Sequence, residues 1–146
     1  MKTRIVTLCI FLIIMAFTAV EIYGENENFY IPKSNEEIYG TWINEDMITQ
    51  KLIYYYWGYA EIYREVSQET PTYKFTFTIV EKWSDSKGNV WYKTFNRGNA
   101  AIGIEFWITK ISNTGTVYES VSNVGEFPTK DELNIDNFNY VIYYRQ

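Results

Sequence analysis

Carboxylates are the only acid groups that this chain offers for acid catalysis or metal binding. Its 146 residues contain no histidine and one cysteine, Cys9. Without histidine the chain lacks the usual general base at neutral pH, the Ser/His and Cys/His pairs of nucleophilic catalysis, and a common ligand of zinc and copper. Most classes of enzyme are therefore disfavoured, and we expect a protein that is not an enzyme.

The densest group of carboxylates lies in TKDELNID, which contains Asp131, Glu132 and Asp136. A calcium loop needs oxygen ligands at a set spacing and a glycine at its sharp turn, and this segment has neither. It is better explained as a solvated loop or as one helical turn. Asp85 and Gly88 in SDSKGN are residue types that favour a hairpin turn. No pair of acids stands out as a glycosidase couple, so we expect no catalytic residue, no metal site and no cofactor.

The first residues have the features of a secretion signal. Residues 1–4 carry two positive charges, and residues 5–20 carry none. This apolar run is shorter than the roughly 18 to 20 residues of a membrane span, so we predict a signal peptide over residues 1–24. The mature protein is then secreted or periplasmic. An uncleaved membrane anchor and a lipoprotein modified at Cys9 are less favoured alternatives.

Removal of this leader takes away the only cysteine, so the mature chain has no disulfide and its stability must come from packing. We expect a lead-in over residues 25–37 and a single domain over residues 38–146, because the length suits one hydrophobic core. The net charge of −5 disfavours nucleic acid as a partner.

The composition and the apolar pattern favour strands. Aromatic residues make up 19% of the chain, and residues 73–81 and 101–111 alternate between apolar and polar positions. In the first of these segments the apolar face consists of Tyr73, Phe75, Phe77 and Ile79. In the second it consists of Ile102, Ile104, Phe106 and Ile108, which leaves Trp107 pointing outward.

Turn-forming residues divide the mature chain into a regular series of eight predicted strands. Short links between them imply antiparallel neighbours in sequence order, and pairing of the last strand with the first removes both exposed edges. The predicted fold is all-β, an eight-stranded antiparallel up-and-down barrel, and this strand number can hold one small ligand. The predicted strands are 38–44, 50–57, 59–66, 73–81, 90–96, 101–111, 116–122 and 138–145.

The segment IYGTWIN places Gly40 two residues before Trp42 at the start of the first predicted strand, and Arg145 lies near the end of the eighth. This arrangement resembles the lipocalins and the wider calycin group, in which a G-x-W motif on the first strand packs against an arginine from the last. A long helix after the last strand, a disulfide and a second motif are missing, so the resemblance is to a bacterial lipocalin-like protein. The alternative is that Trp42 is an ordinary core residue and Arg145 a solvated terminal charge.

The physical properties of the same three residues also suit the closed end of a barrel. A glycine leaves room for a neighbouring group, and a guanidinium over an indole face gains roughly 0.5 to 2 kcal/mol. We therefore expect Gly40, Trp42 and Arg145 to form one end of the barrel and to hold the two termini of the domain together.

The resemblance also implies a ligand cavity inside the barrel. The segment KLIYYYWGYAEIY has four consecutive aromatic residues and so carries aromatics on both faces, one of which could meet a protein or a membrane surface. We expect an extracytoplasmic lipocalin-like protein that binds or sequesters a small apolar or amphipathic ligand. The alternative is a surface or interaction protein whose barrel is filled by side chains. By strand parity, the candidate ligand-binding residues are Tyr54, Tyr56, Phe75, Phe77, Ile104 and Phe106.

Overall fold

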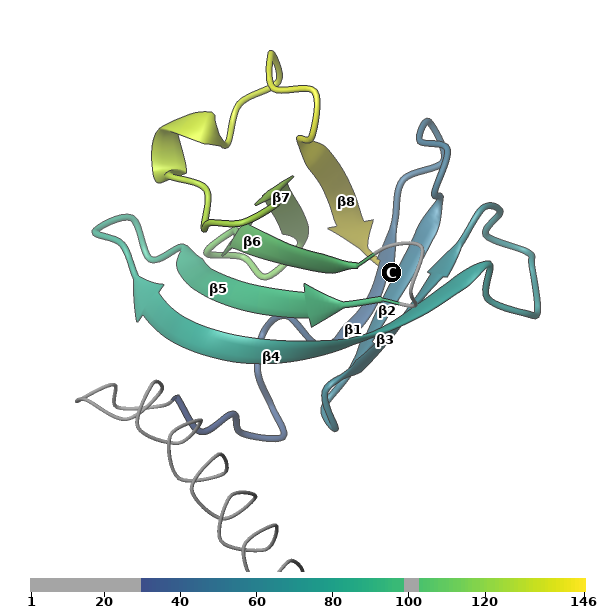
Figure 1. The fold of residues 1–146 in the computed structure, drawn as a ribbon, viewed down its shortest axis with the longest axis horizontal. Helices are drawn as coiled ribbons and strands as arrows, with labels where there is room; N and C mark the ends of the chain where they lie inside the picture. The colour runs from purple at the N-terminus through teal and green to yellow at the C-terminus, as the bar shows by residue number, and fades with distance from the viewer. Residues whose placement is uncertain (1–29, 99–102) are drawn as a thin grey trace, which may run out of the picture.

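The computed structural model describes residues 30–98 and 103–146 and has the predicted all-β architecture (Figure 1). Its strands follow one another around a closed barrel in sequence order, and every neighbouring pair is antiparallel. The predicted up-and-down barrel is therefore confirmed. The predicted signal peptide, residues 1–24, lies outside the described residues. The strands are β1 (Gly40–Ile43), β2 (Lys51–Tyr55), β3 (Tyr59–Tyr63), β4 (Tyr73–Ser84), β5 (Val90–Arg97), β6 (Ile104–Ile111), β7 (Val117–Asn123) and β8 (Val141–Arg145).

The first and last strands close the barrel over a short seam. Trp42 pairs with Arg145, and Ile43 pairs with Tyr144. Hydrogen bonds extend the seam at both ends, because the amide nitrogen of Gln146 donates to the Thr41 carbonyl at 3.0 Å and Asn44 Nδ2 donates to the Ile142 carbonyl at 2.9 Å. No strand edge between β1 and β8 is left open.

The longest strand, β4, bends and so pairs with β3 along its first part and with β5 along the rest. It pairs with β3 from Tyr73 to Thr76 and with β5 from Thr76 to Ser84, with an irregularity in register between Ile79 and Glu81. A bulge of this kind increases local twist and bends the strand. The curve of β4 beneath β5 and β6 is visible in Figure 1.

The interior of the barrel is packed mainly with aromatic and aliphatic side chains. Tyr54 makes edge-on contacts with Phe75 and Phe77, with ring centroids 5.9 and 4.8 Å apart, and Trp42 lies 5.4 Å from Tyr118. Aromatic pairs in these geometries add stabilisation beyond their buried area. The core consists of Ile38, Trp42, Leu52, Tyr54, Ala60, Phe75, Phe77, Ile79, Tyr92, Ile111, Tyr118 and Tyr143.

A second apolar cluster lies on the outside of the barrel. Trp91, Ile108 and Val121 are buried there, with Trp83 and Leu133 packed against them. The chain between β7 and β8 contributes Leu133 to this cover and contains one 3-10 turn, η1 (Lys130–Glu132), so TKDELNID combines one helical turn with a loop. Near its C-terminal end β6 is therefore buried on both faces, at Ile108 on the outside and at Thr109 and Ile111 on the inside.

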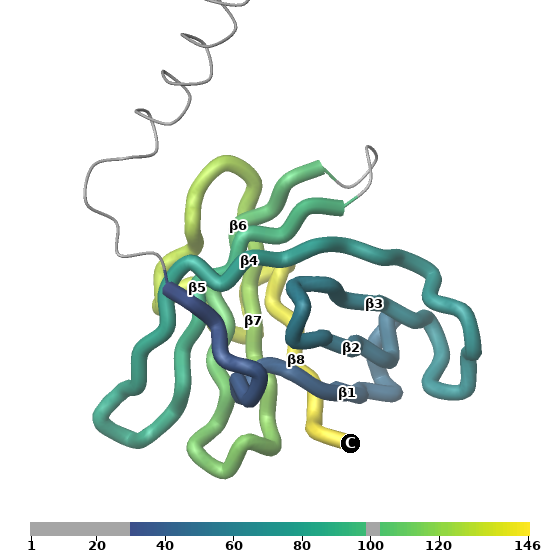
Figure 2. Tube along the Cα trace, turned by 90° about the horizontal axis from the view of Figure 1, so that it is seen from below, coloured from purple at the N-terminus to yellow at the C-terminus, as the bar shows by residue number. Residues whose placement is uncertain are grey.

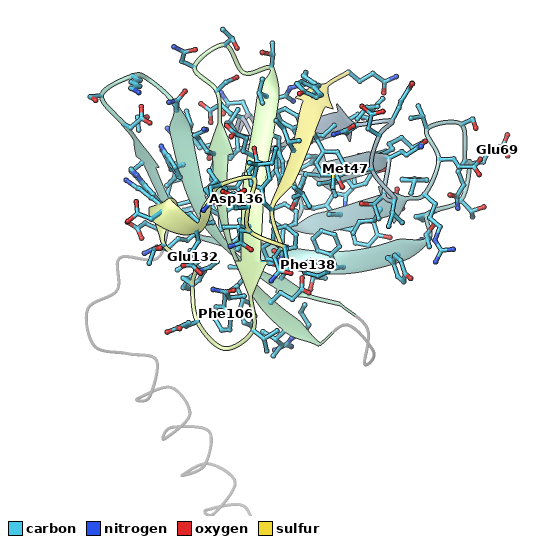
Figure 3. The ribbon with its side chains drawn as sticks, turned by 90° about the horizontal axis from the view of Figure 1, so that it is seen from above. Met47, Glu69, Phe106, Glu132, Asp136 and Phe138 are labelled. Atoms are coloured by element: carbon cyan, nitrogen blue, oxygen red, sulfur yellow. The ribbon has the colours of Figure 1, made fainter. Side chains whose placement is uncertain are left out.

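The two ends of the barrel differ. Residues 30–39 run across one end before they enter β1, and Figure 2 views the molecule from that side. The loops over residues 44–50 and 133–140 rise from the other end, which Figure 3 views, with Met47 and Phe138 labelled on these loops. We call the first the closed end and the second the open end.

Candidate functional site

At the closed end, Arg145 lies over the ring of Trp42, as the sequence led us to expect. The guanidinium carbon is 4.0 Å from the centroid of the indole, and the indole is fully buried. Trp42 Nε1 donates to the Ile38 carbonyl at 2.9 Å, so its one polar group is satisfied. The guanidinium also donates to the backbone carbonyls of Tyr39 and Glu37, each at 2.5 Å, and of Gly115 at 3.2 Å.

Gly40 leaves the space that this arginine occupies. A Cβ atom added at Gly40 would lie 2.6 Å from Arg145 Nη1, and the residue has a φ of +118°, which side chains of L-residues rarely adopt. A glycine therefore permits both the positive φ of the backbone at this position and the close approach of the guanidinium. Gly40, Trp42 and Arg145 thus form one structural unit that joins β1 to β8.

Behind this unit, two glutamates of the lead-in bind a lysine of β4. Lys82 Nζ lies 2.6 Å from Glu36 Oε2 and 2.6 Å from Glu37 Oε2. The Tyr92 hydroxyl donates to Glu37 Oε2 at 2.5 Å and lies 3.2 Å from Glu36 Oε2. Tyr30 adds a further hydrogen bond to Glu36. We call Glu36, Glu37 and Lys82 the lead-in latch, because they hold residues 30–39 against the barrel.

The pKa values of the latch reflect its partners. Burial opposes ionisation of Glu36 and Glu37, but hydrogen bonds from Lys82 and from tyrosines outweigh it, so both pKa values lie below the ordinary 4.5. Burial likewise works against the charge of Lys82, yet its bonds to both glutamates raise its pKa above 10.5. All three groups are stabilised in their charged forms, which suits a structural clamp rather than proton transfer.

Toward the open end, the barrel contains a cavity of about 110 Å³. Most of its wall is apolar, supplied by strands β2, β3, β4 and β8, while β5 and β6 supply the polar part. The lining residues are Thr49, Leu52, Tyr54, Ile62, Phe75, Asn96, Gly98, Glu105, Trp107, Val141 and Tyr143.

The polar wall of the cavity is incompletely hydrogen-bonded. Asn96 is 4% exposed, and its Oδ1 atom has no hydrogen-bond partner among the described residues. Nearby on β5, Thr94 Oγ1 is also buried without a partner. Glu105 Oε2 accepts a hydrogen bond from Trp107 Nε1 at 3.0 Å, and Thr49 shares one with the Tyr143 hydroxyl at 2.7 Å. A buried amide oxygen without a partner costs free energy unless something else binds it.

The structure brings together only part of the predicted ligand-binding set. Tyr54 and Phe75 line the cavity, and Phe77 lies in the core against Tyr54. Tyr56 is 60% exposed in the turn after β2, where strand parity no longer applies.

The inward orientation predicted for Ile104 and Phe106 is wrong. Ile104 is 41% exposed, and the ring of Phe106 packs at 5.0 Å against Phe127 on the outer side of the sheet (Figure 3). The opposite face of β6 lines the cavity with Glu105 and Trp107. A one-residue error of parity exchanges the two faces of a strand, and the apolar face here meets the chain between β7 and β8 instead of the core.

Sequence reasoning missed Glu105 and Trp107 because it assigned the more apolar face of their strand to the interior, and it missed Asn96 because it assigned no inner face to residues 90–96. The available signal was the length of the connection before β8. The seventeen residues from 124 to 140 are enough chain to cover an outer face, so apolar residues on β6 did not have to point inward.

Aromatic side chains also gather outside the barrel, around the turn between β2 and β3. Trp57 is 61% exposed and stacks on Tyr55 with centroids 4.9 Å apart. Below it, Glu61 accepts hydrogen bonds from the hydroxyls of Tyr55, Tyr59 and Tyr63. A groove of about 320 Å³ separates Tyr56 and Trp57 from the lead-in.

Comparison of the chain with protein families, with curated proteins and with solved structures gave no match. Within residues 30–98 and 103–146, no group of three or more acidic, histidine or cysteine side chains is arranged to hold a metal ion. In that same part of the chain, no helix is both long and apolar enough to cross a membrane.

Proposed function

We propose that this protein is an extracytoplasmic, lipocalin-like binding protein that takes up a small amphipathic molecule in the cavity at the open end. The observation that carries the proposal is Asn96, whose buried Oδ1 atom has no partner and whose side chain lines a mainly apolar cavity. Ligand sites commonly combine an apolar wall with a few placed polar groups that fix the orientation of the ligand. Such a site binds a molecule with one polar end and one apolar end.

The size of the cavity limits the ligand. Typical ligand pockets measure roughly 300 to 1,000 Å³, whereas an apolar cavity of about 150 Å³ holds benzene. A cavity of about 110 Å³ is smaller than either, so it suits a short chain or a single ring whose substituent stays at the mouth of the cavity. Fatty acids and polycyclic compounds are too large for a cavity of this size.

Neighbouring residues on β8 provide a direct test with benzyl alcohol as the probe. Val141 lines the cavity, while Ile142 is paired with Glu119 on a strand face that points outward. We expect the parent protein and Ile142→Phe to bind benzyl alcohol in NMR titrations, and Val141→Phe to lose binding because the added ring fills the cavity. Absence of binding by the parent, or equal binding by both variants, would reject the proposal.

The proposed location outside the cytoplasm is supported by the charged start and the uncharged run of residues 5–20. N-terminal sequencing of exported protein should begin at Glu25. A protein that starts at Met1 in a membrane fraction would indicate the anchored alternative.

A second candidate function is contact with a partner through the aromatic turn between β2 and β3. Tyr56 and Trp57 are 60% and 61% exposed, and Ile31 of the lead-in is 83% exposed. Large exposed aromatic side chains commonly mark interaction surfaces. Sedimentation with phosphatidylcholine vesicles tests a membrane partner, and Trp57→Ser should then reduce the bound fraction.

A further inference from the structure

Among the described residues that line the cavity, the one charged side chain is a carboxylate. The part of this lining that the structure describes includes Glu105 and contains no lysine or arginine. Asn96 Oδ1, the buried atom without a partner, is also a hydrogen-bond acceptor. The cavity therefore presents negative charge and acceptor oxygens to whatever enters it.

Glu105 is held in place for such a role. Its Oε2 atom accepts a hydrogen bond from Trp107 Nε1, and both side chains line the cavity. That bond fixes the carboxylate at the cavity wall and does not use the Oε1 atom. Glu105 pairs with Asn96 across the β5–β6 ladder, so the carboxylate and the unpartnered amide oxygen come from directly opposite positions of two adjacent strands.

The remaining walls suit a positive charge attached to an apolar body. Tyr54, Phe75, Trp107 and Tyr143 bring four aromatic side chains to the lining, beside the aliphatic Leu52 and Val141. Aromatic faces attract cations as well as apolar groups. An anionic ligand would meet the carboxylate without a compensating positive group in this lining.

We infer that the ligand is a small organic amine, with its ammonium group bound by Glu105 and Asn96 and its apolar part in the cavity. This inference rests on the proposed ligand-binding function and specifies the chemical class of the ligand. An ammonium group donates hydrogen bonds and accepts none, so it complements the Glu105 carboxylate and the Asn96 Oδ1 atom, both of which accept. The cavity volume of about 110 Å³ restricts the amine to a single ring or a short chain.

Three probes of nearly equal size test this inference: benzylamine, benzyl alcohol and benzoate. They share one ring and differ in the charge of the substituent. Titration calorimetry at neutral pH should give a dissociation constant for benzylamine at least about tenfold lower than for benzyl alcohol, since charge-assisted hydrogen bonds are the stronger kind. Benzoate should show no binding.

Glu105→Gln tests the assigned residue. This isosteric change keeps an oxygen that can accept from Trp107 and removes the charge, so we expect the preference for benzylamine over benzyl alcohol to fall to within about threefold. Benzyl alcohol should bind the variant as well as it binds the parent. The matched control is Glu69→Gln, which makes the same charge change on an exposed loop residue at the edge of the molecule (Figure 3).

A second measurement does not depend on any variant. The indole N–H resonance of Trp107 should shift when benzylamine is added, because its acceptor Glu105 then binds the ammonium group. Tighter binding of benzoate or benzyl alcohol than of benzylamine, or a preference for benzylamine that survives Glu105→Gln, would overturn the amine assignment and leave ligand binding intact. Failure of all three probes to bind would overturn the proposed function as well.

Discussion

At the scale of single residues, Trp42 and Arg145 stabilise the fold in different ways. Trp42 is a large, fully buried side chain, so Trp42→Ala should lower the free energy of unfolding by about 3 to 5 kcal/mol. Arg145→Ala should cost about 2 to 3 kcal/mol. It removes the cation over the indole and also leaves three backbone carbonyls without their donor.

The double variant tests whether the contact between Arg145 and Trp42 itself stabilises the fold. Because the guanidinium and the indole touch, urea unfolding of the double variant should show a loss smaller than the sum of the two single losses. Losses that add to within roughly 0.3 to 0.5 kcal/mol would mean that the two residues act independently.

At the scale of elements, the lead-in should respond to acid through the lead-in latch. The pKa values of Glu36 and Glu37 are lower in the folded protein than their ordinary 4.5, so protons bind the unfolded chain more readily. The latch therefore stabilises the fold above the ordinary pKa, and this contribution is lost as the pH falls through the folded pKa values. The raised pKa of Lys82 gives a contribution present below 10.5 and lost at higher pH, as the pH rises through its folded pKa.

We expect the free energy of unfolding, measured in urea, to fall between about pH 6 and about pH 3. Lys82→Met should make this dependence shallower, because the glutamates lose the partner that lowers their pKa values. Lys87→Met, at an exposed lysine of the β4–β5 turn, is the matched control and should keep the parent's dependence. Equal slopes in the two variants would show that the latch does not govern acid stability.

Two positions on the outer face of β6 provide a second test at the scale of elements. Ile108 and Ile104 share the outer face of one strand, but Ile108 is 2% exposed beneath the chain between β7 and β8, whereas Ile104 is 41% exposed. Ile108→Ala should therefore cost about 2 to 4 kcal/mol, and Ile104→Ala less than about 1 kcal/mol. Neither change should affect ligand binding. Similar costs at both positions would argue against a buried outer cluster.

This strand also shows why the cavity was harder to predict than the barrel. Alternation of apolar and polar residues identifies a strand, but it identifies the inner face only when the outer face meets water. On β6 the outer face is partly covered, most fully at Ile108, and the cavity receives Glu105 and Trp107 from the less apolar face. Tyr54 and Phe75 were predicted correctly as cavity-lining residues because β2 and β4 have one buried face and one more exposed face there.

At the scale of the whole molecule, the barrel could be predicted because its signals are local and repeated. Most connections are short enough to impose an antiparallel neighbour, and the Gly40, Trp42 and Arg145 positions at opposite ends of the domain indicated that β1 meets β8. The filling of the interior is a property of many side chains at once, so no segment of sequence reveals that the cavity is as small as about 110 Å³.

Closure of the barrel can be tested in solution through the β1–β8 seam. Ile43 and Tyr144 are directly paired across it, and Tyr144 is 51% exposed, so cysteines at both positions lie within reach of a disulfide. In a Cys9→Ala background, Ile43→Cys with Tyr144→Cys should oxidise readily and stabilise the protein by about 2 to 4 kcal/mol, because the bond closes a very long loop of the unfolded chain.

Ile53→Cys with Tyr144→Cys is the matched control, since Ile53 pairs with Glu61 on β3 and with Thr41 on β1, away from β8. This pair should remain reduced under the same conditions. The seam between β1 and β8 consists of two paired positions and the hydrogen bonds that flank them. A disulfide at this seam therefore reinforces the barrel where its strand pairing is shortest. If the seam cysteines form no disulfide, β1 and β8 are apart in solution and the barrel is open.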